Sequence, residues 1–82
     1  MFYTYILLSE KDGKHYIGST GDLEDRLERH FSGRSKATKN RLPLRLVYKE
    51  EFETRKEALR REKQIKSYKG GNAFKKLINM GR

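Results

Sequence analysis

The amino-terminal segment of this chain, residues 2–8, constrains its fold more than any other feature. It is rich in aromatic, β-branched and aliphatic residues, which favour a strand. Residues 10–13 then predict a turn, and residues 15–20 return to strand-forming types, so the two segments predict a β-hairpin. Because the chain has only 82 residues, later elements must pack on this hairpin around one thin core. We therefore expect a single domain over residues 1–82.

The middle of the chain predicts a helix, a loop and a third strand. Asp22 is a suitable N-cap for a helix over residues 23–31, in which carboxylates come early and cations late. Residues 32–41 mix Gly, Ser, Thr and Asn with cations and predict a loop. The third strand is predicted from Pro43 to about Phe52. Side chains alternate between two faces of this strand, with Leu44, Leu46 and Tyr48 on one face and Arg45, Val47 and Lys49 on the other.

The last part of the chain predicts two helices. A capping box formed by Thr54 and Glu57 starts a helix over residues 55 to about 68. Two glycines end it, and Asn72 can cap a short third helix. The predicted element order is ββαβαα, an α+β fold in which helices flank a small three-stranded antiparallel sheet.

The charge of the chain is strongly positive. Twenty Lys and Arg against eleven Asp and Glu give a net charge of +9, which attracts polyanions and predicts a nucleic acid as partner. Charge alone does not indicate catalysis, because nucleic-acid-binding proteins that are not enzymes are equally basic. No membrane is expected, since no apolar run approaches the roughly 20 residues that span a bilayer.

The chain has no cysteine, which excludes disulfides, thiolate chemistry and cysteine-type zinc sites. Met1 leads directly into the first predicted strand, without a signal-peptide pattern. We expect a cytoplasmic protein, with a monomer favoured and no small-molecule cofactor.

Glu62 occupies an unexpected position in the helix predicted over residues 55–68. A carboxylate without a partner costs several kcal/mol to bury, so Glu62 must meet a cation, bind a metal or face an open cleft. An ion pair with Lys66 or Arg61 and a functional role explain the position equally well. On a helical wheel, Glu62 falls within the apolar stripe of Ala58, Leu59 and Ile65.

Arg26 and His30 form a second unexpected group, one turn apart in the helix predicted over residues 23–31. Each residue alone suits a structural role, as an arginine that reaches water or as a hydrogen-bonded core histidine. Together, the arginine can clamp a phosphate oxygen while the histidine accepts or relays a proton. His30 lies within, and Arg26 at the edge of, the apolar stripe of Leu23, Leu27 and Phe31.

Tyr5 and Tyr16 lie on the two paired strands of the predicted hairpin. Tyrosine in a sheet usually packs in the core. Here the two rings can also share one face of the sheet, where their hydroxyls can reach phosphate or water and their rings can stack on bases.

These residues together resemble the signature of the GIY-YIG nuclease family. Tyr3-Thr4-Tyr5 and, eleven residues after Tyr5, Tyr16-Ile17-Gly18 are similar to the two tripeptides of the family, although Tyr3 and Thr4 replace its usual Gly and Ile. Arg26 and Glu62 stand where the family has its arginine and its metal-binding glutamate. The likeness runs from about residue 2 to residue 78. The chain resembles the short stand-alone bacterial members, which are related to the amino-terminal nuclease domain of the DNA-repair excinuclease.

The resemblance implies the GIY-YIG fold and a metal-dependent endonuclease. Its substrate would be nucleic acid, with DNA favoured, cut with structural or weak selectivity. By the same resemblance, Glu62 holds one Mg²⁺ or Mn²⁺ and Arg26 stabilises the charge on the scissile phosphate. Tyr5 or Tyr16 positions or deprotonates the attacking water, and His30 serves in the proton relay.

Further residues are candidates for holding the nucleic acid, as cations along the phosphate backbone or, for Asn72, as a match to an asparagine of the family. They are Lys14, His15, Lys36, Lys39, Arg41 and Asn72. Gly18 is expected to be glycine for a backbone reason, either a bulge or a close approach of the chain to substrate.

Three hypotheses follow from these observations. The first is an endonuclease. The second is a binding module that keeps the fold but has lost turnover or needs a partner. The third is a structural basic protein in which Glu62 forms a buried ion pair with Arg26.

Overall fold

The computed structural model describes residues 1–80, so residues 81–82 of the predicted domain lie outside the described residues. The elements are β1 (Phe2–Ser9), β2 (His15–Thr20), α1 (Leu23–Phe31), the 3-10 helix η1 (Lys39–Arg41), β3 (Leu44–Phe52), α2 (Arg55–Ser67) and α3 (Asn72–Met80). The strands form one antiparallel sheet in the order β2-β1-β3. The predicted ββαβαα order and α+β fold are confirmed, with η1 as an addition inside the predicted loop.

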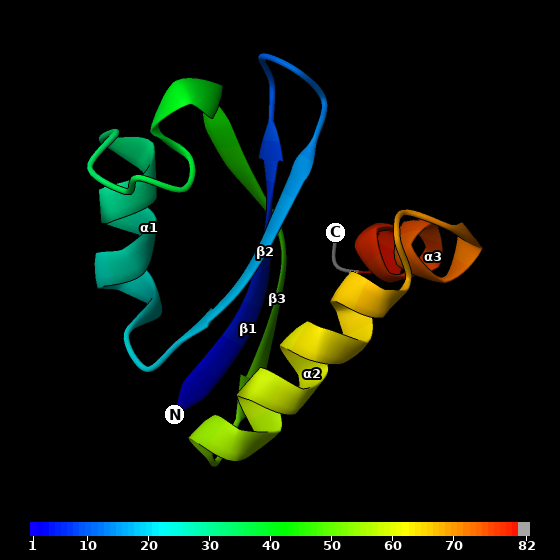
Figure 1. Cartoon of the computed structure of the whole chain (residues 1–82). Coiled ribbons are helices and arrows are strands. Elements are labelled where there is room, and N and C mark those ends of the chain that lie inside the picture. Colours follow the sequence, from blue (N-terminus) through cyan, green and yellow to red (C-terminus); the bar gives the residue numbers. More distant parts are fainter. Residues whose placement is uncertain (81–82) are drawn as a thin grey trace.

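The sheet separates two helical layers, with α1 on one face and α2 and α3 on the other (Figure 1). We call these the α1 face and the α2–α3 face. Side chains alternate along β1, so Thr4 and Ile6 reach α2 while Tyr5 reaches α1. The central strand therefore serves both layers.

The apolar core lies on the α2–α3 face and is formed by Ile6, Val47, Ile65, Phe74 and Leu77. Val47 reaches it through a β-bulge. In the β1–β3 ladder Ile6 pairs with Tyr48 and Leu7 pairs with Leu46, so Val47 has no partner of its own. The simple alternation predicted for this strand was therefore wrong at Val47.

The predicted helix starts are confirmed for two helices. The Asp22 side chain accepts a hydrogen bond from the Asp25 N–H at 3.0 Å. Thr54 and Glu57 form the predicted capping box. At the third helix the prediction was wrong, because Asn72 is already the first helical residue and the Gly71 carbonyl accepts the first hydrogen bond.

Two apolar residues predicted to face the sheet lie on the surface instead. Phe31 is 45% exposed and Leu59 is 44% exposed. In each helix the inward face follows the spacing i, i+3, i+4, i+7, with polar side chains at central positions, and both residues fall beside that face. These positions are Leu23, Arg26, Leu27 and His30 in α1, and Ala58, Arg61, Glu62 and Ile65 in α2.

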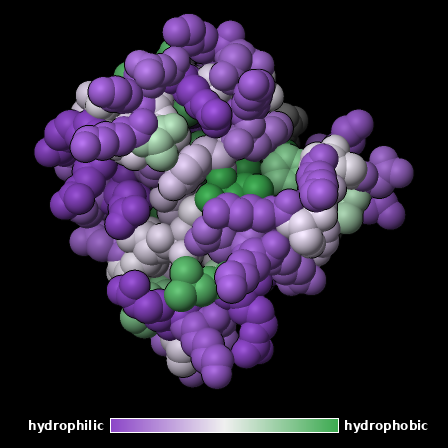
Figure 2. All heavy atoms as spheres, in the orientation of Figure 1, coloured by the Kyte–Doolittle hydropathy of each residue, from purple (hydrophilic) through white to green (hydrophobic). Residues whose placement is uncertain are grey.

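The outer surface is mainly hydrophilic. Figure 2 shows polar and charged side chains over most of the visible face, with small apolar areas between them. Within the described residues, no helix combines the length and the apolar character needed to cross a membrane.

Candidate active site

Three aromatic rings meet on the α1 face, and each comes from a different element. Tyr5 of β1 and Tyr16 of β2 have ring centroids 6.3 Å apart. His30 of α1 lies 5.8 Å from Tyr5 and 5.0 Å from Tyr16, measured between ring centroids. The structure thus brings together the two tyrosines and the histidine that the sequence marked as candidates.

A chain of hydrogen bonds fixes this cluster. The Tyr5 hydroxyl lies 3.0 Å from His30 Nε2, and His30 Nδ1 lies 2.7 Å from the Thr38 Oγ1. All three residues are buried, with His30 1% exposed. Because both ring nitrogens have partners, the orientation of the imidazole is fixed. The sequence does not indicate a role for Thr38, because the composition of the segment around it is typical of an open cationic loop.

Burial controls the protonation of this cluster. It raises the pKa of Tyr5 well above its ordinary value, with Tyr16 adding to the rise and Arg26 opposing it. Burial and the nearby Arg26 charge lower the pKa of His30. At neutral pH, Tyr5 is therefore a neutral phenol and His30 a neutral imidazole.

Gly18 makes room for Tyr5. The two residues are paired across β1 and β2. A Cβ atom at position 18 would lie 2.6 Å from the Tyr5 hydroxyl oxygen and 3.0 Å from Tyr16 Cε1. The β1–β2 ladder is regular, so a bulge at Gly18 is excluded. The glycine is required because the Tyr5 ring lies directly over its backbone.

Glu62 approaches the same edge strand from the α2–α3 face. Its Oε1 accepts a hydrogen bond from the Ser19 hydroxyl at 2.6 Å, and its Oε2 lies 2.7 Å from the Lys66 ammonium. The Glu62 side chain is 18% exposed. Arg61, the other cation considered for Glu62, pairs with Glu50 at 2.9 Å.

The site extends around β2, which is an edge strand of the sheet. The charges of Arg26 on α1 and Glu62 on α2 both act on the pKa of Tyr5, Arg26 lowering it and Glu62 raising it. Within the described residues no ion pair joins Arg26 to Glu62, so the buried pair of the structural hypothesis is wrong. Arg26 and Glu62 instead lie on the two sides of one edge.

The donor set at Glu62 fits a hard divalent ion bound through one carboxylate. Such an ion keeps water molecules as its other ligands, so it does not need a cluster of acidic side chains. Among residues 1–80, no group of three or more His, Cys, Asp or Glu side chains lies together in a way that could hold a metal ion. The Lys66 ammonium already places a positive charge at Oε2, and its side chain is 54% exposed.

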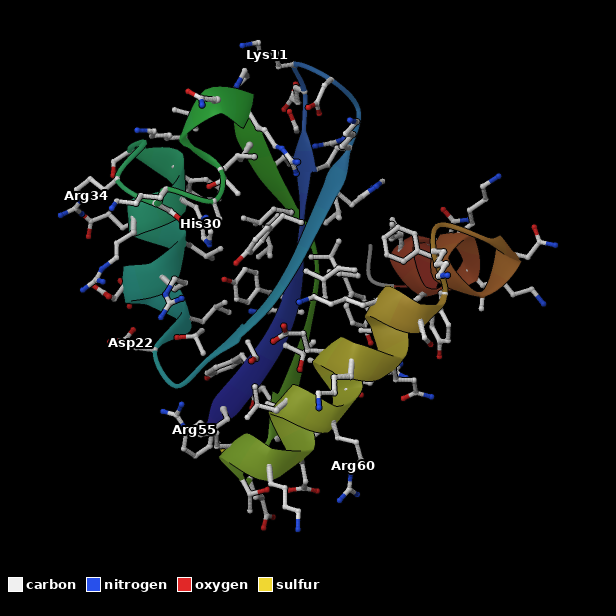
Figure 3. All side chains as sticks on the ribbon, viewed as in Figure 1. Lys11, Asp22, His30, Arg34, Arg55 and Arg60 are labelled. Carbon is white, nitrogen blue, oxygen red and sulfur yellow. The ribbon has the colours of Figure 1, made fainter. Side chains whose placement is uncertain are left out.

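The candidate nucleic-acid-binding residues divide into two sets. Lys14, His15 and Arg41 border one hollow on the α2–α3 side. The remaining three, Lys36, Lys39 and Asn72, are exposed and do not line this hollow. Figure 3 shows His30 on the side of α1 that faces the sheet and Arg34, a cation of the loop, on the far side.

Comparison with known proteins supports the resemblance seen in the sequence. A model of the family described as the GIY-YIG catalytic domain matches residues 1–75. The UPF0213 protein SSP2268 of Staphylococcus saprophyticus is 44% identical over 80 residues, which cover 96% of this chain and 95% of that protein. The UPF0213 protein SA0446 of Staphylococcus aureus is 48% identical over 58 residues, 70% of this chain and 71% of that protein. The solution NMR structure of the UPF0213 protein BH0048 from Bacillus halodurans is 38% identical, covers 90% of this chain and 92% of that one, and has a TM-score of 0.49.

Proposed function

The chain belongs to the GIY-YIG catalytic domain family, whose members are generally nucleases, and on this premise we propose that it is a divalent-metal-dependent endonuclease. Its substrate is nucleic acid, with DNA favoured over RNA. One observation supports the proposal: Arg26 of α1 and Glu62 of α2 lie on the two sides of the edge strand β2, where Ser19 donates a hydrogen bond to Glu62. This arrangement offers a cation and a carboxylate to one phosphodiester group.

Glu62 would hold the Mg²⁺ or Mn²⁺ ion, and the hydrogen bond from Ser19 orients its carboxylate. When bound, such an ion makes a coordinated water more acidic and offsets the negative charge of the phosphate. Arg26 donates hydrogen bonds to a non-bridging phosphate oxygen. Its charge opposes the charge that accumulates there as the bond breaks.

Hydrolysis adds the oxygen of water to phosphorus and breaks one ester P–O bond. The water loses one proton, and the leaving sugar oxygen gains one. Tyr16 is half-buried and packs against His30, so its hydroxyl is the phenol available to orient the attacking water. Tyr5 is fully buried and bonded to His30, and we assign it as a positioning residue for Tyr16 and Arg26.

The size and charge of the domain favour weak selectivity. A net charge of +9 binds any polyanion, and phosphate contacts position a strand without reading its bases. We therefore propose that the enzyme recognises the shape of its substrate, such as a flap, branch or single strand, in preference to a base sequence.

The test is cleavage of labelled duplex, flap, branched and single-stranded DNA, with RNA counterparts, in Mg²⁺ or Mn²⁺. Wild type should cut at least one substrate, and Glu62→Gln should cut it at least about 100-fold more slowly with the metal in excess. The matched control is Glu53→Gln, which removes an exposed carboxylate just before the N-cap of α2 and should leave the rate unchanged.

A second candidate is the binding module without turnover. The ion pair with Lys66 favours it, because that pair satisfies the Glu62 carboxylate without any metal. Binding of the whole panel by folded wild type, with no cutting in either metal and equal binding by Glu62→Gln, would establish this alternative and reject the nuclease.

A further inference from the structure

Two adjacent hollows lie on the α2–α3 side of the sheet, beside the first residues of β2. Their volumes are about 340 and 360 Å³, and they share His15, Gly70 and Phe74 as walls. Ile17 and Ile65 extend the apolar floor of the smaller one. The His15 ring packs edge-on against Phe74, with the ring centroids 4.9 Å apart. Neither hollow includes a residue assigned above to the cleavage chemistry.

Cations surround this floor. Lys14, Arg41 and Lys69 border the smaller hollow, and Lys75 borders the larger one. The Asp12 carboxylate lies 4.0 Å from Arg41, which makes a weak ion pair. The Arg41 guanidinium can therefore bind another anion. An aromatic and apolar floor with a cationic rim complements a nucleotide, whose base and sugar are flat or apolar and whose phosphate is anionic.

A left-handed residue just after the C-cap commonly ends a helix, but after α2 that residue is a lysine where a glycine is usual. Lys69 has a φ of 49° and Gly70 a φ of 76°, both in the left-handed region. This conformation suits glycine but disfavours a lysine. A residue held in such a conformation against its preference often serves a function. Here it places a lysine at the rim of the hollow.

The hollows are in line with the cleavage site. Glu62 on α2 and Lys69 just beyond its end are seven residues apart, which corresponds to about 10 Å of helix. On β2, Ser19 and His15 share one face and are four residues apart, which corresponds to about 13 Å. A stacked strand that rises about 3.4 Å per nucleotide covers this distance in three to four nucleotides.

We propose that these hollows hold an unpaired nucleotide of the substrate strand, three to four positions from the scissile phosphate. The numbering of the position rests on the proposed function, because Glu62 defines the scissile phosphate. Occupation of the hollows by a strand does not require turnover. The two ideas can therefore fail separately.

The test measures binding of a fluorescein-labelled single-stranded DNA of 20 nucleotides, and its RNA counterpart, by anisotropy in EDTA. Lys69→Gly should weaken affinity about three- to tenfold and reduce the slope of log K against log salt by about one. It should not lower thermal stability, because glycine accepts the left-handed backbone. His15→Ala should weaken affinity about tenfold with a smaller change in the salt slope.

The matched control is Lys63→Ala, which removes an exposed cation from another face of α2 and should change affinity less than twofold. Equal losses in Lys69→Gly and Lys63→Ala would overturn the proposal, since they would show a general effect of charge. An abasic scan then locates the nucleotide: removing the held base should weaken binding by wild type but not by His15→Ala.

The outcomes separate the two proposals. If wild type cuts but Lys69→Gly and His15→Ala bind like wild type, the hollows have no such role and the nuclease stands. If both variants lose affinity and nothing is cut in Mg²⁺ or Mn²⁺, the binding site stands and the nuclease fails. If wild type binds neither DNA nor RNA, this proposal is rejected.

Discussion

The main buried clusters on the two faces of the sheet are held together by different interactions. On the α2–α3 face the buried cluster is apolar and contains Ile6, Ile65 and Phe74. On the α1 face Tyr5, His30 and Thr38 are equally buried but are joined by hydrogen bonds. Among the described residues, no buried side-chain nitrogen or oxygen lacks a hydrogen-bond partner. The buried polar side chains on the α1 face therefore all have hydrogen-bond partners.

The two faces therefore contribute differently to the stability of the domain and to the orientation of its side chains. Apolar contacts have no preferred direction and scale with the area removed from water, so the apolar cluster on the α2–α3 face contributes stability without fixing orientations. Hydrogen bonds have a preferred geometry, so the α1 face fixes ring positions. β1 is the central strand and carries side chains into both layers. The apolar core therefore holds in place the strand that positions the polar cluster.

The largest loss of stability is expected from a cavity in the apolar core on the α2–α3 face. Ile65→Ala should lower the free energy of unfolding by about 2 to 5 kcal/mol, because Ile65 is fully buried. For a domain of this size the total is about 4 to 12 kcal/mol. Urea denaturation measures the loss, with Leu59→Ala as control in the same helix. If exposed Leu59 matters as much as Ile65, burial against the sheet is not what makes Ile65 important for stability.

The next effect comes from the contact between the two strands under the polar cluster. Gly18→Ala should lower the free energy of unfolding by about 1 to 3 kcal/mol, because its Cβ would lie 2.6 Å from the Tyr5 oxygen. Adding Tyr5→Leu should recover part of this loss. Additive effects of the two substitutions in a double-mutant cycle would show that the residues do not compete for the same space.

The hydrogen-bonded chain itself is tested at Thr38. Thr38→Val keeps the shape but leaves His30 Nδ1 without its partner, which should lower the free energy of unfolding by about 1 to 2 kcal/mol. Cleavage should slow as well, because the imidazole loses its fixed orientation. Thr38→Ser restores a hydroxyl and should restore both properties. No recovery with serine would point to lost packing of the methyl group as the cause.

A smaller effect is expected in the pH dependence of stability. The pKa of His30 is lowered in the folded state, mainly by burial, so the unfolded chain binds its proton first as the pH falls. Stability from this group is complete above the unfolded pKa of about 6.5 and declines below it, by at most about 1.4 kcal/mol per pH unit. Urea midpoints between pH 7 and pH 5 should fall less steeply in His30→Gln. An unchanged slope would assign the dependence to other groups, such as His15, whose pKa is also lowered by burial.

The smallest effect is expected at the Glu62–Lys66 ion pair. Lys66→Gln should change the free energy of unfolding by only about 0.3 to 0.5 kcal/mol, because the lysine is exposed and the pair spans one helical turn. It should tighten Mn²⁺ binding severalfold by removing a competing cation from Oε2. Weaker Mn²⁺ binding in this variant would show that Lys66 supports the ion instead of competing with it.

Local signals predicted most of the fold correctly. The Asp22 cap, the capping box at Thr54 and the hairpin turn depend on residues a few positions apart, so the sequence contains them in full. Val47 was misplaced because a bulge arises from the pairing of two strands that are far apart in sequence.

The candidate site was predicted less completely. Residue type and spacing indicated four candidates that lie close together in the structure. They are Tyr5, Tyr16, His30 and Arg26. Thr38 carries no such mark, since its role depends on how the loop returns to α1. Phe31 and Leu59 were assigned inward because an apolar residue normally faces the core more often than a polar one. Here polar side chains, His30 in α1 and Glu62 in α2, occupy part of the inward face of each helix.

The close contact between Gly18 and Tyr5 has an evolutionary consequence. Tyr5 fills the volume that a side chain at position 18 would need, so a side chain at 18 fits without strain only where the tyrosine has been replaced. A lineage that gained a side chain at 18 would therefore lose stability or replace the tyrosine, and replacing the tyrosine would also remove the partner of His30. Such a lineage could regain the arrangement only by restoring both the glycine and the tyrosine.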